Sequence, residues 1–386
     1  MSVVERIWWA PRPGLAQGAL LSPLLLAEAG FRAGAALRGA LYDARWLAIA
    51  RAPAPVVSIG NLAAGGAGKT PAALAVAVRL AARGRRVALL SRGYGAARSD
   101  ARVVADGTRL LLGAEEGGDE PVLAARRVPG LAVLCGPRRA ELALRAVETL
   151  GADALLLDDG FQHRALARDL DVVVLDAANP FGNGHLLPRG PNREPRAALA
   201  RAGLLWLSRV DQADPAALEP LRALAREATG RAPVESRHAP VELVDGLLAA
   251  PLGLGALRGR RVLLLSGLAR PGGFRRTVEG LGAEIALERV FPDHHRFTPA
   301  ELDEVFRAAD AARCERVVTT EKDAVRLEPA SAADPRLVAV RIEAQVVRGG
   351  DALDAALDAA LAAFPAPLAS ALAHPGSPQT PSQPTR

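Results

Sequence analysis

A glycine-rich loop between an apolar run and a helical pattern carries the most specific chemical signal in the sequence. The apolar run covers residues 56–59, and the loop ends in Gly65-Gly66-Ala67-Gly68-Lys69-Thr70. Glycines let backbone N–H groups converge on phosphate oxygens, and a helix that begins at the end of the loop directs its positive end at the same anion. In such a P-loop the lysine contacts the β- and γ-phosphates and the threonine hydroxyl contacts Mg²⁺. The alternative is an ordinary glycine turn, since the first motif position is Ala63 rather than glycine.

The choice of basic residues supports the phosphate site. The chain has 48 lysine and arginine residues, and only Lys69 and Lys322 are lysines. An ammonium is a compact point charge, whereas a guanidinium is a planar fork, so the two are not interchangeable around phosphate. A lysine in this background indicates a position that arginine does not suit. For Lys322, which follows a strand pattern, chance is the competing explanation.

Two pairs of adjacent carboxylates are candidates for metal binding and proton transfer. Asp158 and Asp159 end an apolar strand pattern, which is where an acidic residue of a P-loop protein meets Mg²⁺. Adjacent strand residues face opposite sides, so the two aspartates are expected to have different tasks. Asp119 and Glu120 precede a helical pattern. Asp119 either caps that helix or accepts a proton from an attacking hydroxyl while Glu120 assists Mg²⁺.

The remaining candidates are histidines and arginines. His294 and His295 are adjacent, but no third ligand with suitable spacing accompanies them, so we do not expect zinc. A histidine here is instead a candidate to support a catalytic carboxylate. The stiff basic loop at 187–195 carries arginine forks that suit phosphate.

Composition narrows the function classes. A chain of 386 residues favours two domains. The formal net charge of +6 indicates an acidic partner: a nucleotide, a nucleic acid or an anionic lipid. Only 4% of the residues are aromatic, without basic–aromatic interleaving, which argues against nucleic acid. Cys135 and Cys314 give no disulfide framework or metal spacing, so a reducing cytosol is expected.

The elements that must position these residues follow an α/β alternation. We expect a P-loop domain at 52–210, with a mostly parallel sheet and helices on both faces. Its strand patterns lie at 56–59, 87–91, 131–135, 154–158, 171–175 and 204–207. The segment 92–118 is read as a hairpin or a flap. A second, smaller α/β domain is expected at 211–364, including a last helix near 351–363, and a disordered tail at 365–386.

The N-terminal 51 residues differ from the rest of the chain. The apolar stretch 15–31 is interrupted by Pro23 and Glu28 and is too short for a membrane span. Residues 31–51 then space four arginines among apolar and aromatic side chains. This pattern is typical of a basic amphipathic helix at an anionic lipid surface. The alternative is a helix that packs on the protein's own core.

The motifs together resemble the tetraacyldisaccharide 4'-kinase family over residues 10–364. The motifs that carry the resemblance are Ser58-Ile59-Gly60-Asn61, the P-loop, Ser91-Arg92-Gly93-Tyr94-Gly95, Gly118-Asp119-Glu120-Pro121, Asp158-Asp159-Gly160-Phe161-Gln162-His163, Asp293-His294 and Thr320-Glu321-Lys322-Asp323. The resemblance implies an ATP- and Mg²⁺-dependent kinase of lipid A biosynthesis. Its acceptor would be the 4'-hydroxyl of a tetraacylated glucosamine disaccharide 1-phosphate, and it would be a peripheral, monotopic protein on the cytoplasmic face of the bacterial inner membrane.

The resemblance also assigns roles by motif. Asp119 resembles the catalytic base, with His294 as its partner. The phosphate and metal regions match Lys69, Thr70, Glu120, Asp159 and Gln162, and the active-site arginines match Arg139 and Arg193. Two departures are Ala67, where the family often has threonine, and Asn192, where leucine is usual.

Two other functions compete with the kinase. A nucleotide-switch or partitioning ATPase would share the P-loop and the acidic strand end, but it would not need an Asp119–His294 pair or a lipid-facing helix. A cytosolic small-molecule kinase would differ only at the N-terminus.

Overall fold

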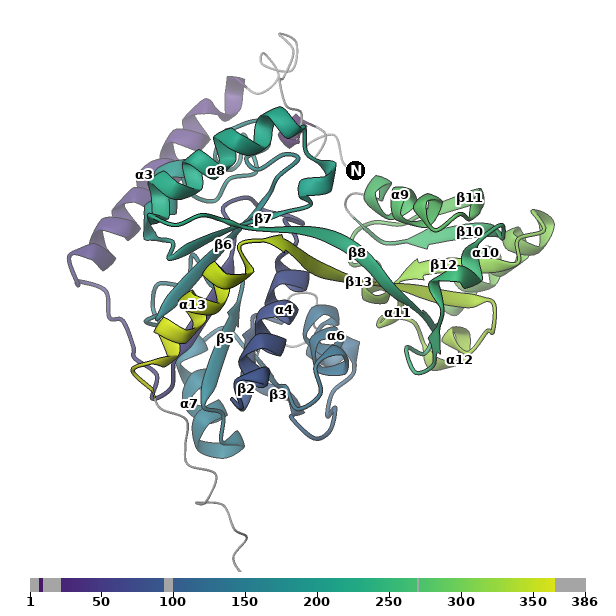
Figure 1. The fold of residues 1–386 in the computed structure, drawn as a ribbon, viewed down its shortest axis with the longest axis horizontal. Helices are drawn as coiled ribbons and strands as arrows, with labels where there is room; N and C mark the ends of the chain where they lie inside the picture. Colours follow the sequence, from purple (N-terminus) through teal and green to yellow (C-terminus); the bar gives the residue numbers. More distant parts are fainter. Residues whose placement is uncertain (1–6, 10–21, 94–99, 269–270, 365–386) are drawn as a thin grey trace, which may run out of the picture.

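A parallel sheet forms the centre of the larger of two lobes in the computed structural model, which describes residues 7–9, 22–93, 100–268 and 271–364 (Figure 1). The parallel strands of this large lobe are β1 (Val56–Gly60), β2 (Val87–Ser91), β4 (Ala132–Cys135), β5 (Ala154–Asp158), β6 (Leu170–Asp176) and β7 (Leu204–Ser208). They are almost entirely buried, as expected for strands covered on both faces.

The helices of the large lobe cover both faces of this sheet (Figure 1). They include α4 (Lys69–Ala82), α6 (Asp119–Arg127), α7 (Arg139–Leu150) and α8 (Pro215–Thr229). Helix α4 begins directly after the glycine-rich loop, with Pro71 in its first turn, where a missing N–H costs nothing. Its buried side chains recur at helical spacing: Ala72, Ala73, Val76, Ala77 and Leu80.

The segment 100–118 forms the edge of the large lobe. Strand β3 (Arg102–Asp106) pairs antiparallel with β4, and the chain turns back so that the Leu111 N–H donates to the Val104 carbonyl at 2.8 Å. A short helix α5 (Ala114–Gly117) follows. Residues 102–112 therefore form a hairpin, as one of the two predictions for this segment had it. Residues 94–99 of the predicted hairpin or flap lie outside the described residues.

The small lobe has its own parallel strands and covering helices. Its strands are β10 (Arg261–Ser266), β11 (Glu284–Val290) and β12 (Arg316–Thr320), and its helices are α9 (Gly272–Gly280), α10 (Pro299–Ala311), α11 (Glu321–Ala324) and α12 (Pro329–Ala332). Between β8 and β10 lie the short strand β9 (Pro251–Leu252), which pairs with β8, and the 3-10 helix η4 (Leu254–Leu257). The prediction of a P-loop-type α/β fold with a second, smaller α/β unit is confirmed.

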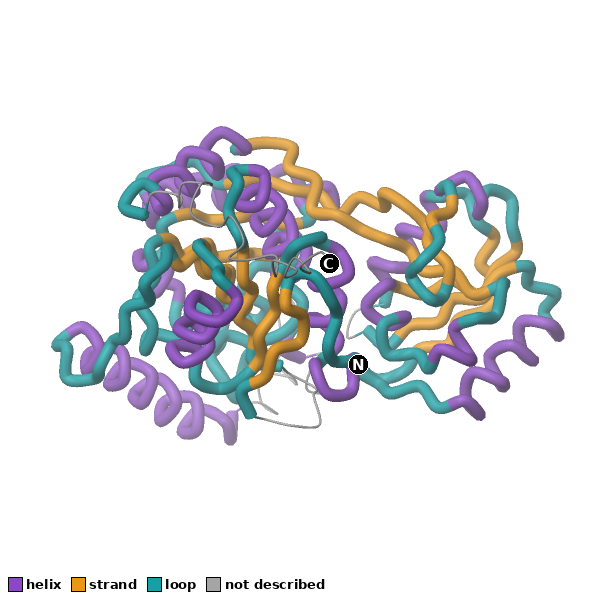
Figure 2. The backbone as a smooth tube through the Cα atoms, turned by 90° about the horizontal axis from the view of Figure 1, so that it is seen from below, coloured by secondary structure: helices purple, strands orange, loops and turns teal. Residues whose placement is uncertain are grey.

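Two long antiparallel strands join the lobes. Strand β8 (Val234–Asp245) begins beside β7, and β13 (Leu337–Arg348) begins beside β12. They pair over most of their length, so the described strands form one sheet in the order β11-β10-β12-β13-β8-β7-β6-β1-β5-β2-β4-β3. Figures 1 and 2 show this ribbon passing from one lobe to the other.

The last helix, α13 (Gly350–Leu361), follows β13 back to the large lobe. Its residues Leu353, Leu357 and Leu361 pack in one core with Val57 and Val76. The sequence pattern grouped this helix with the second set of elements. An apolar stripe specifies that a helix must be covered, but it does not specify by which strands.

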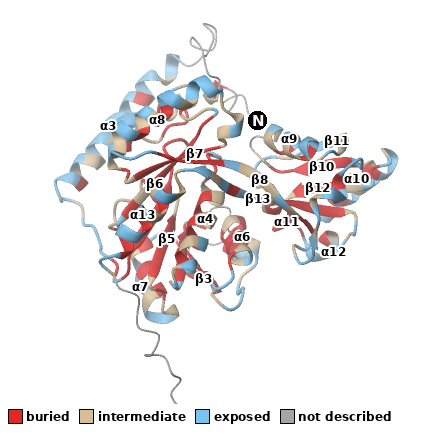
Figure 3. Ribbon diagram, viewed as in Figure 1, coloured by how far each residue is buried: buried red, intermediate tan, exposed pale blue. Residues whose placement is uncertain are grey.

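The N-terminal helix α3 (Leu25–Asp43), after the short 3-10 helix η1 (Ser22–Leu24), lies along the outside of the large lobe (Figure 2). Most of its surface is exposed (Figure 3). Buried Glu28 anchors it, because the carboxylate accepts the Leu186 N–H at 3.0 Å and lies 3.4 Å from Arg189. Residues 15–21 of the apolar stretch and the expected tail at 365–386 lie outside the described residues.

Candidate active site

The glycine-rich loop closes between β1 and α4 and is supported from β7 and the residue after it. Gly65 and Gly68 have φ values of +102° and +87°, which side chains other than glycine rarely adopt. A Cβ on Gly68 would also lie 2.9 Å from His238 Nε2. The Ala67 carbonyl accepts a hydrogen bond from Ser208 Oγ at 2.6 Å, and the Gly66 carbonyl accepts one from Arg209 at 2.9 Å. Side chains from β7 and from the residue after it therefore hold the loop in a defined conformation, which an ordinary glycine turn does not need.

Lys69 points toward the carboxyl ends of β1 and β5. Its Nζ donates to Asn61 Oδ1 at 3.1 Å and lies 3.5 Å from Asp159 Oδ1. Arg193 donates to both Asp159 oxygens, at 2.7 and 2.8 Å, and also to Asn61 Oδ1. Burial works to raise the pKa of Asp159, but the charges of Lys69 and Arg193 hold it well below its usual range. Asp159 is therefore an anion paired with two cations.

Asp158 has a different environment from its neighbour, but strand alternation is not the reason: β5 ends at Asp158, and Asp159 follows it in a turn with a φ value of +51°. It lines a small cavity together with Thr70 and Glu120, and its Oδ1 is buried without a hydrogen-bond partner among the described residues. Burial, followed by the charges of Glu120 and Asp159, raises the pKa of Asp158 to about 7. The sequence assigned Asp159 rather than Asp158 to the metal region. Only the fold places Asp158 beside the P-loop threonine.

Gln162 and Arg139 lie at the same edge of the sheet. The Gln162 amide donates to the Asn61 carbonyl at 3.1 Å, and its Oε1 is buried without a partner within the described part of the chain. Arg139, the first residue of α7, is buried and donates to the Gly136 carbonyl. Burial lowers the pKa of Arg139, and the carboxylate of Asp158 opposes that change. Arg139 thus adds positive charge beside the predicted phosphate site.

Asn192, one of the departures from the family pattern, has a local structural role. Its side-chain amide donates to the Phe181 and His185 carbonyls at 2.8 and 2.9 Å. The preceding residue, Pro191, accepts the Ala64 N–H at 2.7 Å. The basic loop is thereby packed against the glycine-rich loop, which carries Arg193 to Asp159.

The predicted pairing of Asp119 with His294 is present in the structure. His294 Nδ1 lies 2.8 Å from Asp119 Oδ2, although α6 carries the aspartate in the large lobe and the loop after β11 carries the histidine in the small lobe. Asp119 is also the first residue of α6, but its side chain makes no capping hydrogen bond to a later turn of the helix. Its carboxylate is buried. The contact places these two residues where the two lobes meet.

Lys322, from α11, lies in the same group. Its Nζ is 3.3 Å from His294 Nε2, 3.3 Å from Glu120 Oε1 and 3.5 Å from Asp293 Oδ1. The sequence singles out this lysine by its rarity and by the motif Thr320-Glu321-Lys322-Asp323, but assigns it no role. Asn61, which contacts Lys69 and Arg193, also lies in a family motif and was not predicted as a site residue. The spacing of residues along the sequence does not indicate a role for Lys322 or Asn61, because their contact partners come from distant segments of the chain.

The oxygen atoms at the cavity suit a magnesium ion. In the described residues no group of three or more His, Cys, Asp or Glu side chains is arranged to hold a metal by itself. Mg²⁺ in kinases is characteristically held by one or two carboxylates together with substrate phosphates and water. The Thr70 hydroxyl, Glu120, and the unpartnered Asp158 Oδ1 and Gln162 Oε1 supply such oxygens.

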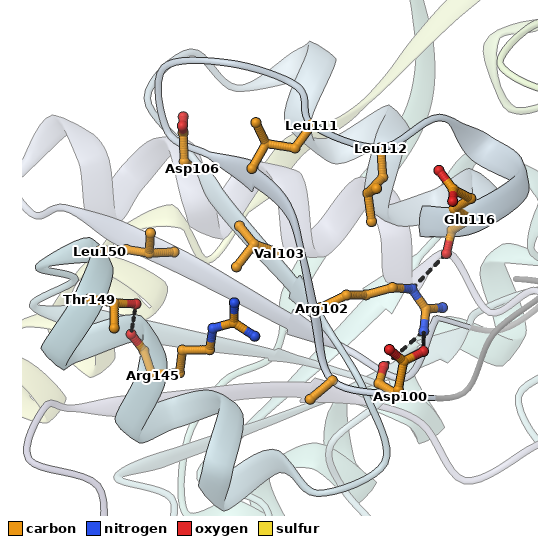
Figure 4. Close-up of a pocket in the computed structure, with 11 residues that line it drawn as sticks. Asp100, Arg102, Val103, Asp106, Leu111, Leu112, Glu116, Arg145, Thr149 and Leu150 are labelled. Carbon is orange, nitrogen blue, oxygen red and sulfur yellow. Dashed lines mark hydrogen bonds and ion pairs between the residues drawn. The ribbon is translucent and has the colours of Figure 1, made fainter.

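A second cavity, of about 610 Å³, lies apart from this chemistry. It is bounded by β3, the returning residues Leu111 and Leu112 and the end of α7 (Figure 4). Arg102 lines it and donates to the backbone carbonyls of Glu116 and Asp100. None of its lining residues belongs to the predicted site.

Helix α3 presents apolar side chains to solvent. The exposed fraction is 86% for Leu26, 62% for Leu37 and 80% for Trp46, which follows the helix. Arg38 donates to the Gln162 carbonyl at 3.1 Å, and Arg32 lies 3.4 Å from Glu28. Within the described ranges, no helix combines the length and the apolar character that crossing a bilayer requires.

A P-loop on a mostly parallel sheet, with buried carboxylates beside it and a carboxylate–histidine pair where the lobes meet, defines a P-loop phosphotransferase. Comparison with known proteins identifies the particular one. The model of the tetraacyldisaccharide-1-P 4'-kinase family matches residues 19–362, and the chain belongs to that family. It is a kinase, and the family reaction is ATP-dependent phosphorylation of the 4' position of a tetraacyldisaccharide 1-phosphate in lipid A biosynthesis.

Similar proteins agree with this assignment. The chain is 76% identical over 362 residues to the tetraacyldisaccharide 4'-kinase of Anaeromyxobacter sp. (strain Fw109-5), covering 94% of this chain and 97% of the relative. It is 40% identical to that of Syntrophus aciditrophicus, covering 84% and 89%. The crystal structure of the "apo" form of LpxK from Aquifex aeolicus in complex with ATP superposes with a TM-score of 0.73 at 30% identity, covering 88% of this chain and 99% of that one.

Proposed function

We propose that Asp119 accepts the proton of the acceptor's 4'-hydroxyl while His294 orients and supports it. The 2.8 Å contact between the two side chains is the observation on which this assignment rests. Burial works to raise the pKa of Asp119, but the hydrogen bond from His294 and the charges of Lys322 and Arg326 hold it below its usual value. Asp119 is then a carboxylate at neutral pH, which is the form that a general base requires.

Lys69, Arg139 and Arg193 would bind and orient the phosphates of ATP. Phosphoryl transfer depends chiefly on positioning and on neutralising charge. Lys69 and Arg193 already converge on Asp159, so we propose that Asp159 holds both cations in readiness for phosphate oxygens. The glycine-rich loop would supply its backbone N–H groups to the same oxygens.

Mg²⁺ would be held by Thr70, Glu120, Gln162 and one of the two adjacent aspartates. When bound, the ion neutralises charge that develops on the phosphate oxygens. To the predicted set we add Asp158, because it shares the cavity with Thr70 and Glu120 while Asp159 is occupied by Arg193. Asp159 would then act from the adjacent position, through its cations or through water.

The decisive experiment is incubation of the full chain with labelled ATP and the tetraacylated disaccharide 1-phosphate. The phosphate should be recovered on the 4' position, and ATP hydrolysis without the lipid should be slow. Rapid hydrolysis that ignores the lipid would instead indicate a nucleotide-switch ATPase, which needs no proton acceptor for a sugar hydroxyl.

The outer face of α3 would dock on an anionic membrane surface. Leu26 and Leu37 are eleven residues apart and therefore project from nearly the same side of the helix, and both are exposed. Contiguous exposed apolar surface usually marks an interaction site, and an acylated acceptor keeps its chains in a bilayer. We place the protein as a monotopic enzyme on the cytoplasmic face of the inner membrane, where ATP is available, with no nucleic-acid partner.

A further inference from the structure

The side chain of Lys322 bridges the two lobes at the proposed catalytic pair. It lies 3.3 Å from His294 Nε2 in the small lobe and 3.3 Å from Glu120 in the large lobe. Only 23% of the side chain is exposed. Carboxylates from both lobes surround its Nζ, with Glu120 Oε1 at 3.3 Å and Asp293 Oδ1 at 3.5 Å. The group facing the histidine is therefore a charged ammonium.

We infer that Lys322 is a positioning residue for the proposed base, because it donates to His294 Nε2 and thereby holds the ring with its Nδ1 hydrogen directed at Asp119. An ammonium donates hydrogen bonds and accepts none. The ring nitrogen that faces it, Nε2, must then act as the acceptor and lack a hydrogen. The proton of the neutral ring therefore resides on Nδ1, where it is donated to Asp119 Oδ2 at 2.8 Å. This inference deepens the proposed function and rests on its assignment of Asp119 as base.

The residues around Lys322 in α11 hold it in place. Thr320, which ends β12, caps α11 by accepting the Asp323 N–H at 3.1 Å. Asp323 is fully buried, pairs with Arg326 and accepts the Gly267 N–H at 3.1 Å. These contacts anchor the turn that carries Lys322, so its ammonium has a defined position.

The loop that carries the histidine is equally defined. His294 has a φ value of +59°, in the left-handed region that residues with side chains rarely adopt. The neighbouring His295 has different partners. Its ring stacks on that of Phe291, with 4.7 Å between the ring centroids, and its Nε2 lies 3.0 Å from Glu301 Oε2. Backbone conformations of this kind persist where the surroundings determine them, and they gather at functional sites.

The inference also explains why a lysine occurs here in an arginine-rich chain. One compact ammonium reaches three partners in different directions, His294, Glu120 and Asp293, at 3.3 to 3.5 Å. A guanidinium is a planar fork that favours a single planar anion. Lys322 also contacts both Glu120, a proposed metal ligand, and His294, the proposed partner of the base. The positions of these two side chains are therefore linked through Lys322.

The test compares full-length Lys322→Met and Lys322→Arg with wild type. The matched control is Arg296→Met, which removes a different cation that joins the lobes, at 3.0 Å from Glu115. Two measurements are made: kcat and the KM for ATP, and the ¹⁵N chemical shifts of the His294 ring at pH 8 without nucleotide. The ring signals are assigned by their loss in His294→Asn.

In wild type we expect His294 in the form with hydrogen on Nδ1. In Lys322→Met the hydrogen should stay on Nδ1, which still faces Asp119, but the Nε2 signal should shift toward that of a ring nitrogen without a donor. The same variant should lower kcat by about tenfold to a hundredfold, with the KM for ATP within about twofold. Lys322→Arg should retain the Nδ1 proton and recover part of kcat. Arg296→Met should change neither the ring signals nor kcat.

Three results would overturn the inference. The first is a wild-type ring protonated at Nε2, which needs no variant and so remains decisive if Lys322→Met does not fold. The second is an unchanged ring signal in Lys322→Met, and the third is a rise in the KM for ATP with kcat unaltered. A wild-type enzyme that fails to phosphorylate the lipid would contradict the proposed function instead, and it would leave the ring measurement intact.

Discussion

Asp119 and His294 are 175 positions apart in the chain, and the 2.8 Å contact between their side chains joins the large lobe to the small one. The proposed proton acceptor therefore belongs to one lobe and its supporting ring to the other. Because β8 and β13 also connect the lobes, a change in the angle between the lobes would open or close this contact. We therefore expect closure of the lobes to assemble the proposed pair.

Replacement of either member of the pair should give nearly the same loss. We expect Asp119→Ala and His294→Ala each to lower kcat by about a hundredfold or more, with little change in the affinity for ATP. The double variant should be only slightly worse than the single ones, because the two side chains act as a unit. Steady-state kinetics with the lipid acceptor measure this. Fully multiplicative losses would mean that the two residues work independently.

Lys69→Ala should lower kcat/KM by roughly a hundredfold or more, since it removes a charge aimed at the transferring phosphoryl group. Lys69→Arg should not restore activity, because the Arg193 guanidinium already contacts Asn61 and Asp159, and a second planar fork does not replace the compact ammonium beside them. Circular dichroism should show that both variants remain folded. Wild-type turnover by Lys69→Ala would contradict the assignment of the phosphate site.

Asp158 makes the ligand-free protein sensitive to pH. Its pKa of about 7 lies above the ordinary aspartate value of 3.8. Between these values the folded state binds more protons than the unfolded state, so stability falls as pH rises through this range. In Asp158→Asn the side chain at this position does not ionise. The free energy of unfolding of this variant should therefore exceed that of wild type by at least about 1 kcal/mol at pH 8, and by less at pH 5.

Urea titrations at the two pH values measure this difference. They must be made without ATP or Mg²⁺, because ligands that bind the folded state add their own stabilisation. An Asp158→Asn increment that is equal at pH 5 and pH 8 would show that Asp158 does not titrate between them. The same variant should be nearly inactive if Asp158 contacts the metal.

The apolar face of α3 should control membrane binding. Replacing Leu26, Leu37 and Trp46 together with serine should reduce binding to anionic vesicles by at least about a hundredfold, because each buried large apolar side chain contributes about 1.5–3 kcal/mol. Leu144→Ser and Val347→Ser, at exposed positions elsewhere, are the controls. Cosedimentation measures binding, and the affinity for ATP should not change. Undiminished binding of the triple variant would exclude this face as the anchor.

Charge reversal of two arginines of α3 and of Arg45, which follows the helix, is a less direct test of the same anchor. We expect Arg32→Glu, Arg38→Glu and Arg45→Glu together to release the protein from anionic vesicles, each arginine contributing about 1 kcal/mol near the surface. Arg38, however, also donates to the Gln162 carbonyl. A loss of activity in that variant could therefore arise inside the site, so only its vesicle binding is informative.

The sequence by itself determined the phosphate site. The strand, the glycines, Lys69 and Thr70 are consecutive, and their functional geometry is local: a buried strand, a loop with left-handed glycines and a helix N-terminus. The sequence also predicted the two pairs of adjacent carboxylates, because each pair lies at the end of a recognisable element: one at the end of β5 and one at the start of α6. The Asp119–His294 pair was also anticipated, but through the family resemblance, because no local pattern connects positions 175 apart.

The tertiary structure alone decided the remaining relationships. Asp158 ends β5 and Asp159 lies in the turn that follows, and only the packing of α4 and α6 shows that Asp158 shares a cavity with Thr70 and Glu120. Lys322 meets Glu120 and His294 because β12 and α11 bring it to the junction of the lobes. Helix α13 joins the core of the large lobe because β13 returns the chain there. Periodicity records which side of an element is buried, whereas the identity of the partner depends on how distant segments are arranged in space.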